Sequence, residues 1–145
     1  MRRSTIVCLL TVSFLAPPLA AQEHAHGGTE RLGRVVFPVS CNAEAQRRFE
    51  RAVALLHSFW WEESEQALQG VAEADSTCAM AYWGLALARW RNPVAGGPGP
   101  ADLRAGQDAA RRAATLGGRT ARERDFIEAA GTLYGDTGTV PNSAR

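Results

Sequence analysis

The residues of this 145-residue sequence that are best equipped for chemistry are a few cysteines and histidines. Cys41 and Cys78 are the two cysteines that follow the first twenty-one residues. An even pair is a disulfide candidate in an oxidising compartment, and two unbonded buried or capping thiols are the alternative. His24 and His26 are a weaker metal candidate: a chain beginning at Gln22 would place a histidine third, where a free amine can help to chelate Cu(II). An N-terminal glutamine cyclises readily, however, which removes that amine.

Recognisable catalytic motifs are missing from the sequence. It has no H-E-x-x-H, G-x-S-x-G or C-x-x-C pattern, and the run Gly96-Gly97-Pro98-Gly99 lacks the Lys-Ser or Lys-Thr pair of a phosphate loop. Glu62 and Glu63 are adjacent, so on a helix they point in different directions and are typical of a negatively charged first turn. We therefore predict a chain that is not an enzyme and uses no cofactor. The alternatives are an N-terminal support for a catalytic part beyond residue 145, and a metal or redox carrier that uses the histidines or cysteines above.

Residues 1–21 have the layout of a secretory signal peptide. Arg2 and Arg3 give a positive start, an apolar run follows from Ile6 to Leu15, and small residues lead to a cleavage site after Ala21 or one residue earlier. The run is short for a bilayer span, although an uncleaved anchor is the alternative. We expect an exported bacterial protein, periplasmic or secreted, with no membrane span in the mature chain.

The charge of the mature chain gives no case for nucleic acid or anionic lipid as a partner. The sequence has 16 basic and 15 acidic residues, and the leader holds two of the basic ones, so 14 oppose 15 and the formal charge is −1. Every basic residue is arginine. About 124 residues remain after cleavage (145 − 21), which is one domain's worth.

Apolar periodicity predicts five helices, at about residues 43–58, 62–74, 79–91, 101–116 and 120–135. Asn42 is the expected N-cap of the first, Thr120 and Glu123 form a capping box for the fifth, and Gly117 ends the fourth. Residues 22–34 are expected to be a flexible tail. Residues 35–39 should be extended, because Pro38 disfavours helix. Residues 35–135 then form the helical domain, and residues 136–145 an irregular tail that continues in a longer protein.

The helices repeat in pairs. A step of 34 residues places Ala52 on Ala86, although neighbouring arginines match poorly. A step of 42, which is one period plus an insertion in the Pro/Gly loop, maps Trp61, Ser64, Leu68 and Val71 onto Leu103, Gly106, Ala110 and Ala113. Two members of the second set, Gly106 and Ala110, are undersized for their positions. A hairpin cannot cover both of its apolar faces alone, so this pattern predicts stacked hairpins.

The segments LHSFWWEE (residues 56–63) and ADSTCAMAYWG (residues 74–84) resemble the tetratricopeptide repeat (TPR) family, in particular exported bacterial TPR proteins of unassigned activity. The resemblance covers about residues 33–134 and is strongest over 45–90. Ser64 stands where the family usually has alanine, and Ser76 where it usually has proline. The resemblance implies an all-α fold in which hairpins stack as a short right-handed α-solenoid that acts as a protein-interaction or scaffold module.

In TPR proteins the first helices of the hairpins line a groove that receives the partner. The resemblance therefore implies an apolar, aromatic groove for a hydrophobic peptide segment, with Arg91 gripping one end. The alternative is that these aromatics form the core, or that residues 35–37 fold back and fill the groove. The implied groove residues are Phe49, Val53, Leu56, His57, Met80, Trp83, Leu87, Trp90 and Arg91.

Repeat geometry also bears on the cysteines. It sets the first and third helices side by side, ~10 Å apart, with their starting ends as neighbours. Cys41 and Cys78 precede those two ends, and a disulfide requires Cα atoms within about 7 Å. The resemblance therefore implies a Cys41–Cys78 bond.

Overall fold

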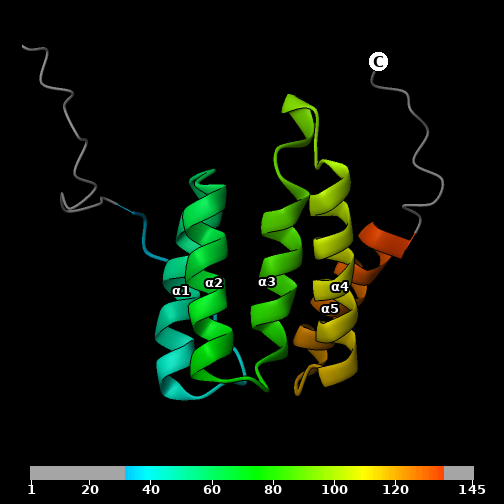
Figure 1. Ribbon diagram of the computed structural model, residues 1–145. Coiled ribbons are helices and arrows are strands. Elements are labelled where there is room, and N and C mark those ends of the chain that lie inside the picture. The colour runs from blue at the N-terminus through cyan, green and yellow to red at the C-terminus, as the bar shows by residue number, and fades with distance from the viewer. Residues whose placement is uncertain (1–31, 136–145) are drawn as a thin grey trace, which may run out of the picture. The chain divides into compact units, whose positions relative to one another are not determined.

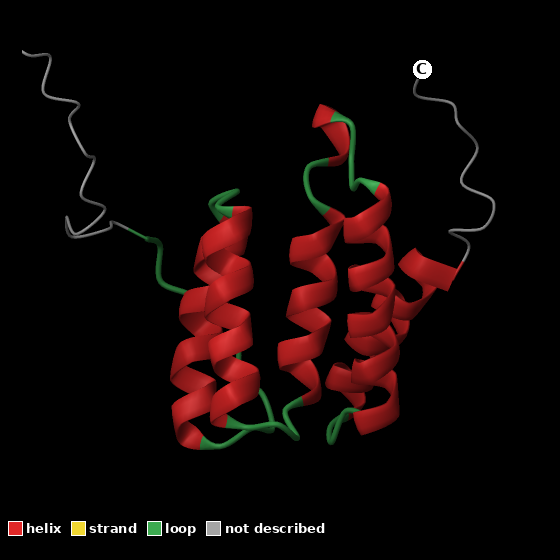
Figure 2. Cartoon of the chain, in the orientation of Figure 1, coloured by secondary structure: helices red, strands yellow, loops and turns green. Residues whose placement is uncertain are grey.

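The computed structural model describes residues 32–135. All regular secondary structure in this part of the chain is helical, as Figures 1 and 2 show. No strand occurs between residues 32 and 135, so the predicted all-α class is confirmed. The expected signal peptide, His24, His26 and the C-terminal tail lie outside the described residues. The helices are α1 (Ala43–His57), α2 (Trp61–Ala74), α3 (Ala79–Trp90), the short 3-10 helix η1 (Pro93–Ala95), α4 (Pro100–Leu116) and α5 (Ala121–Gly135).

The predicted caps set the helix boundaries. Each α-helix begins and ends within one residue of its predicted boundary. The side chain of Asn42 accepts a hydrogen bond from the Ala45 N–H at 2.9 Å, as an N-cap does. Thr120 and Glu123 bond reciprocally: the Glu123 N–H donates to the Thr120 hydroxyl at 3.1 Å, and the Thr120 N–H donates to the Glu123 carboxylate at 3.0 Å. Gly117 ends α4 with φ +73°, a conformation that favours glycine. Local chemistry thus determines where the helices begin and end.

The α-helices pack in order along the chain. In Figure 1, α1 pairs with α2 and α3 with α4; α2 also packs on α3, and α5 packs on both α4 and α3. The positions that the 42-residue step equates behave alike, because the set Ser64, Leu68 and Val71 and the set Gly106, Ala110 and Ala113 are all buried. Ser64 is tolerated in the core because its hydroxyl donates to the Ala52 carbonyl at 3.0 Å.

Tyr134 explains why Gly106 and Ala110 are small. Its ring is 1% exposed and packs with Ala86 and Ala110, and its hydroxyl donates to the Ala86 carbonyl at 2.8 Å. A Cβ atom at Gly106 would lie 2.0 Å from that hydroxyl. The two positions are therefore not undersized. A tyrosine from α5 fills the space that they leave.

Cys41 and Cys78 lie at the starting ends of α1 and α3, as repeat geometry implied. Their sulfur atoms are 1.99 Å apart and their Cα atoms 5.1 Å apart, which is disulfide distance. Cys78 is 1% exposed. This link joins the chain just before α1 to the beginning of α3. Within residues 32–135, no helix has the length and apolar character needed to cross a membrane.

Candidate functional site

A segment without regular secondary structure, residues 35–40, packs against the helices and is called the strap here. Its Phe37 ring sits among three other aromatic rings, with centroid distances of 5.4 Å to Phe49, 5.7 Å to Trp83 and 5.3 Å to Phe126. Val35 and Val39 pack against the same core cluster. The strap therefore brings an apolar side chain onto α1, α3 and α5, as the fold-back alternative anticipated.

Five of the nine predicted groove residues lie in the core. They are each at most 8% exposed: Phe49, Val53, Leu56, Met80 and Trp83. In this structure the chain itself covers these side chains, and their role as a partner surface stays a prediction. The physical reason is the cost of leaving such large apolar side chains in water, which the Phe37 ring helps to avoid.

Leu56 and the other four predicted residues gather around an open hollow of about 250 Å³, which we call the end hollow. It lies where α1 and α3 end and α2 begins, and its walls are mainly apolar. Phe59, 70% exposed, stands at its edge, and His57 is also exposed. The residues that line it are Leu56, His57, Phe59, Trp61, Leu87, Trp90 and Arg91. Its volume is below the ~300–1,000 Å³ of typical small-molecule pockets, so it suits one or two side chains better than a cofactor.

Backbone strain concentrates at the end hollow. Phe59 has φ +62° and Arg91 has φ +60°, and no other non-glycine residue in the described part of the chain has a positive φ. Such a conformation costs roughly 1–2 kcal/mol for a residue with a side chain. Strained residues of this kind cluster at binding and catalytic sites. Both strained residues line one hollow, which makes the hollow the strongest candidate for a functional site.

Arg91 is not a free cation. Its guanidinium contacts Glu62 at 3.1 Å and Asp102 at 3.4 Å, and Glu65 lies 3.7 Å away. Arg89 joins the same network through Asp102 at 2.8 Å and through Glu65. Acidic side chains from α2 and α4 therefore already contact this guanidinium, and the grip of Arg91 on the end of a peptide stays a prediction.

This network places acidic side chains around Arg91, which lines the end hollow. Two arginines face Glu62, Glu65 and Asp102, so the group carries a formal charge of −1. The hydrogen bond from Arg89, helped by one from Arg91, holds the pKa of Asp102 below its ordinary value. Asp102 therefore stays ionised at neutral pH. Glu62 has a side chain that is 73% exposed, so the excess negative charge faces solvent.

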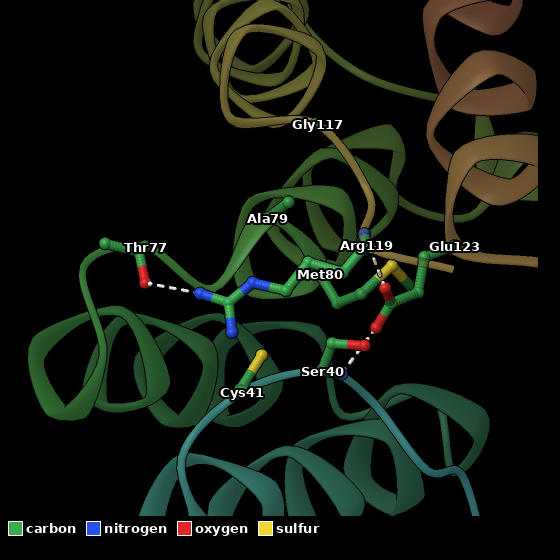
Figure 3. A pocket seen from close by; sticks show the side chains of 8 residues that line it. All are labelled: Ser40, Cys41, Thr77, Ala79, Met80, Gly117, Arg119 and Glu123. Atoms are coloured by element: carbon green, nitrogen blue, oxygen red, sulfur yellow. Dashed lines mark hydrogen bonds between the residues drawn. The ribbon is translucent and has the colours of Figure 1, made fainter. Parts of the chain in front are cut away.

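Glu123 joins the strap to α5, as Figure 3 shows. Besides closing its capping box, its carboxylate accepts the N–H groups of Ser40 and, at 2.9 Å, Arg119. Burial alone would raise its pKa, but the donors from Ser40, Thr120 and Arg119 outweigh burial and lower it. The cavity beside it is about 10 Å³, room for one water at most. We interpret the Glu123 carboxylate and its donors as a structural joint. Its contact with Ser40 could not be predicted from the sequence.

No group of three potential metal ligands occurs among residues 32–135, and the histidines at 24 and 26 lie outside them. A broader depression of about 550 Å³ lies between α4 and α5, where an added Cβ at Gly131 would meet open space. Comparison of the chain with known protein families, with curated proteins and with solved structures found no match.

Proposed function

We propose that this chain is an exported, non-catalytic interaction module of the tetratricopeptide type that binds a protein partner at the end hollow. The observation that carries the proposal is the pairing of the two strained residues, Phe59 and Arg91, on one open apolar hollow. The repeat assignment is supported by the matched burial of equivalent positions on α2 and α4. The apolar depression between α4 and α5 is where a stacked array would receive its next helix.

The chemistry of the hollow specifies the kind of partner. Its apolar floor and small volume suit one large aliphatic or aromatic side chain. The network around Arg91, beside the hollow, carries the excess negative charge described above, with Glu62 exposed. We therefore propose a peptide segment with an apolar anchor followed or preceded closely by Arg or Lys, because opposite charge beside the hollow aids docking and orientation.

Phe59 offers a sharp test, because a glycine there relieves strain while it removes the aromatic wall. The variant Phe59→Gly should fold with unchanged stability or gain up to about 1 kcal/mol, since glycine adopts positive φ freely. A phage-displayed peptide library panned against the wild type should yield basic peptides with an apolar anchor. These peptides should bind Phe59→Gly at least tenfold more weakly.

The matched control is Val94→Ser, which changes another exposed apolar residue, 94% exposed, away from the hollow. It should bind the selected peptides as the wild type does. Peptides that bind Phe59→Gly as tightly as the wild type, or a library that yields no binder, would contradict the proposal.

A further inference from the structure

The backbone of the strap is held by side chains of α1 and α5. The Phe37 N–H donates to Glu50 at 3.2 Å, and the Gln46 side-chain amide donates to the Phe37 carbonyl at 3.1 Å. The same amide accepts the Val39 N–H at 2.8 Å. From α5, Glu123 accepts the Ser40 N–H. These bonds recognise an extended main chain whatever its side chains, which is how grooves hold extended peptides.

The side chains of the strap supply a pattern on top of this main-chain recognition. The Phe37 ring packs into an aromatic box formed by Phe49, Trp83 and Phe126. The Arg122 guanidinium lies 4.2 Å from the centroid of the Phe37 ring, within cation–π range. Val35 and Val39 face the core while Val36 is 71% exposed, so alternate residues point inward. The groove beneath the strap therefore selects an aliphatic residue, an aromatic residue and a second aliphatic residue at alternate positions, while the two positions between them are exposed.

The strap also lies on the core and not within it. All of its residues are half-buried or exposed, whereas Phe49 beneath it is fully buried. The end hollow lies farther along α1 and α3, two of the helices that the strap contacts. On α1, Leu56 follows Phe49 by seven residues, which is about 10 Å of helix. One extended segment of a partner is long enough to cover both places.

We propose that the strap is an exchangeable internal competitor, and that the groove beneath it binds a partner segment of the same aliphatic-x-aromatic-x-aliphatic pattern. The covalent link through α1 keeps the strap at an effective concentration on the order of millimolar. A free peptide with a Kd near 10 µM for the emptied groove would then bind the wild type roughly a hundredfold more weakly. This inference extends the proposed function to an adjoining surface and does not depend on the end hollow.

The test uses the full chain with its disulfide intact and a fluorescently labelled peptide of residues 33–40, GRVVFPVS. The variant Phe37→Ala weakens the internal competitor and opens the aromatic box. Fluorescence anisotropy should show that it binds the peptide at least tenfold more tightly than the wild type does. A peptide with alanine in place of its phenylalanine should not bind. The control variant Val36→Ala, at the exposed strap position, should behave as the wild type.

Two further measurements keep the outcomes separate. Binding should persist in the double variant Phe37→Ala/Phe59→Gly, so that failure of the end hollow does not imitate failure of the strap site. A folded Phe37→Ala protein, judged by its circular dichroism, that binds the peptide no better than the wild type overturns the inference.

Hydrogen exchange of the wild type decides the matter if Phe37→Ala does not fold. The Phe37 and Val39 amides are both hydrogen-bonded to side chains, so their exchange reports opening of the strap. They should exchange at least a hundredfold faster than the Val53 amide in the core of α1, because the strap opens without global unfolding. Equal rates for strap and core would overturn the inference, since the strap would then leave only when the protein unfolds.

Discussion

Trp83→Ala tests whether the aromatic cluster under the strap contributes to the stability of the folded protein. Trp83 is 7% exposed and lies 5.7 Å from Phe37, 6.2 Å from Phe49 and 5.3 Å from Phe126 between ring centroids. Burying such a side chain removes about 150–250 Å² from water, worth ~4–6 kcal/mol at 25 cal/mol per Å². Partial collapse of the space brings the expected loss to ~3–5 kcal/mol.

That loss is a large part of the ~5–15 kcal/mol that holds an ordinary domain together. At ~4–8 °C per kcal/mol, the melting temperature should fall by about 12–40 °C. Urea unfolding followed by circular dichroism, under oxidising conditions, measures the free energy directly. The matched control is Trp60→Ala, at a residue that is 39% exposed in the turn between α1 and α2, where the loss should stay below about 1 kcal/mol.

A Trp83→Ala protein within about 1 kcal/mol of the wild type would refute the reasoning from burial. If this variant also lost the peptides selected on the wild type, those peptides would bind the cluster and not the end hollow. A large loss of stability without any change in the peptides that bind the end hollow is the outcome that the structure predicts.

The other predictions concern the disulfide, an acidic joint and a close helix contact. Changing both Cys41 and Cys78 to Ser should lower stability by about 4 kcal/mol for a link that spans 37 residues, but only against the oxidised wild type; equal melting curves without reductant would mean that no bond forms. Glu123→Gln should cost about 1–2 kcal/mol at neutral pH. Folding lowers the pKa of Glu123, so the wild type has this extra stability at a pH above 4.5, the ordinary pKa, and loses it as the pH falls through the pKa of the folded state. The urea midpoints of the wild type and of Glu123→Gln should therefore converge in acid. A gap that stays constant with pH would contradict this. Gly106→Ala should cost about 1–3 kcal/mol of stability, because the added methyl overpacks the buried Tyr134 ring. Gly131→Ala, also helical but facing open space, should gain up to about 1 kcal/mol. Thermal melts that rank the two variants otherwise would refute the contact between Gly106 and Tyr134.

Local signals in the sequence were enough to predict the helices. Asn42, the Thr120–Glu123 box and Gly117 each satisfy or end a helix through contacts within a few residues, so their chemistry can be read without knowledge of the fold. The buried stripes of α2 and α4 follow in the same way from helical periodicity.

The site was harder to predict because its contacts join distant segments. The Ser40–Glu123 bond spans 83 residues, and no local pattern links these two positions. An apolar segment before Pro38 allowed for a strap but gave no indication of the side chains that hold it. The engagement of Arg91 by Asp102 likewise depends on how α4 returns after the Pro/Gly loop. Division of the predicted groove into a covered half and an open half therefore required the structure.

The ion pairs between Asp102 and Arg91 bracket the loop from Asn92 to Gly99. Since these contacts tie the two flanking helices together, the span between them needs little fixed structure of its own. Extending a flexible loop costs only about 0.6 kcal/mol for each doubling of its length. The Gly96–Gly97 junction should therefore accept an inserted epitope tag or fluorophore site, and a reporter placed there would leave both the strap and the end hollow unmodified.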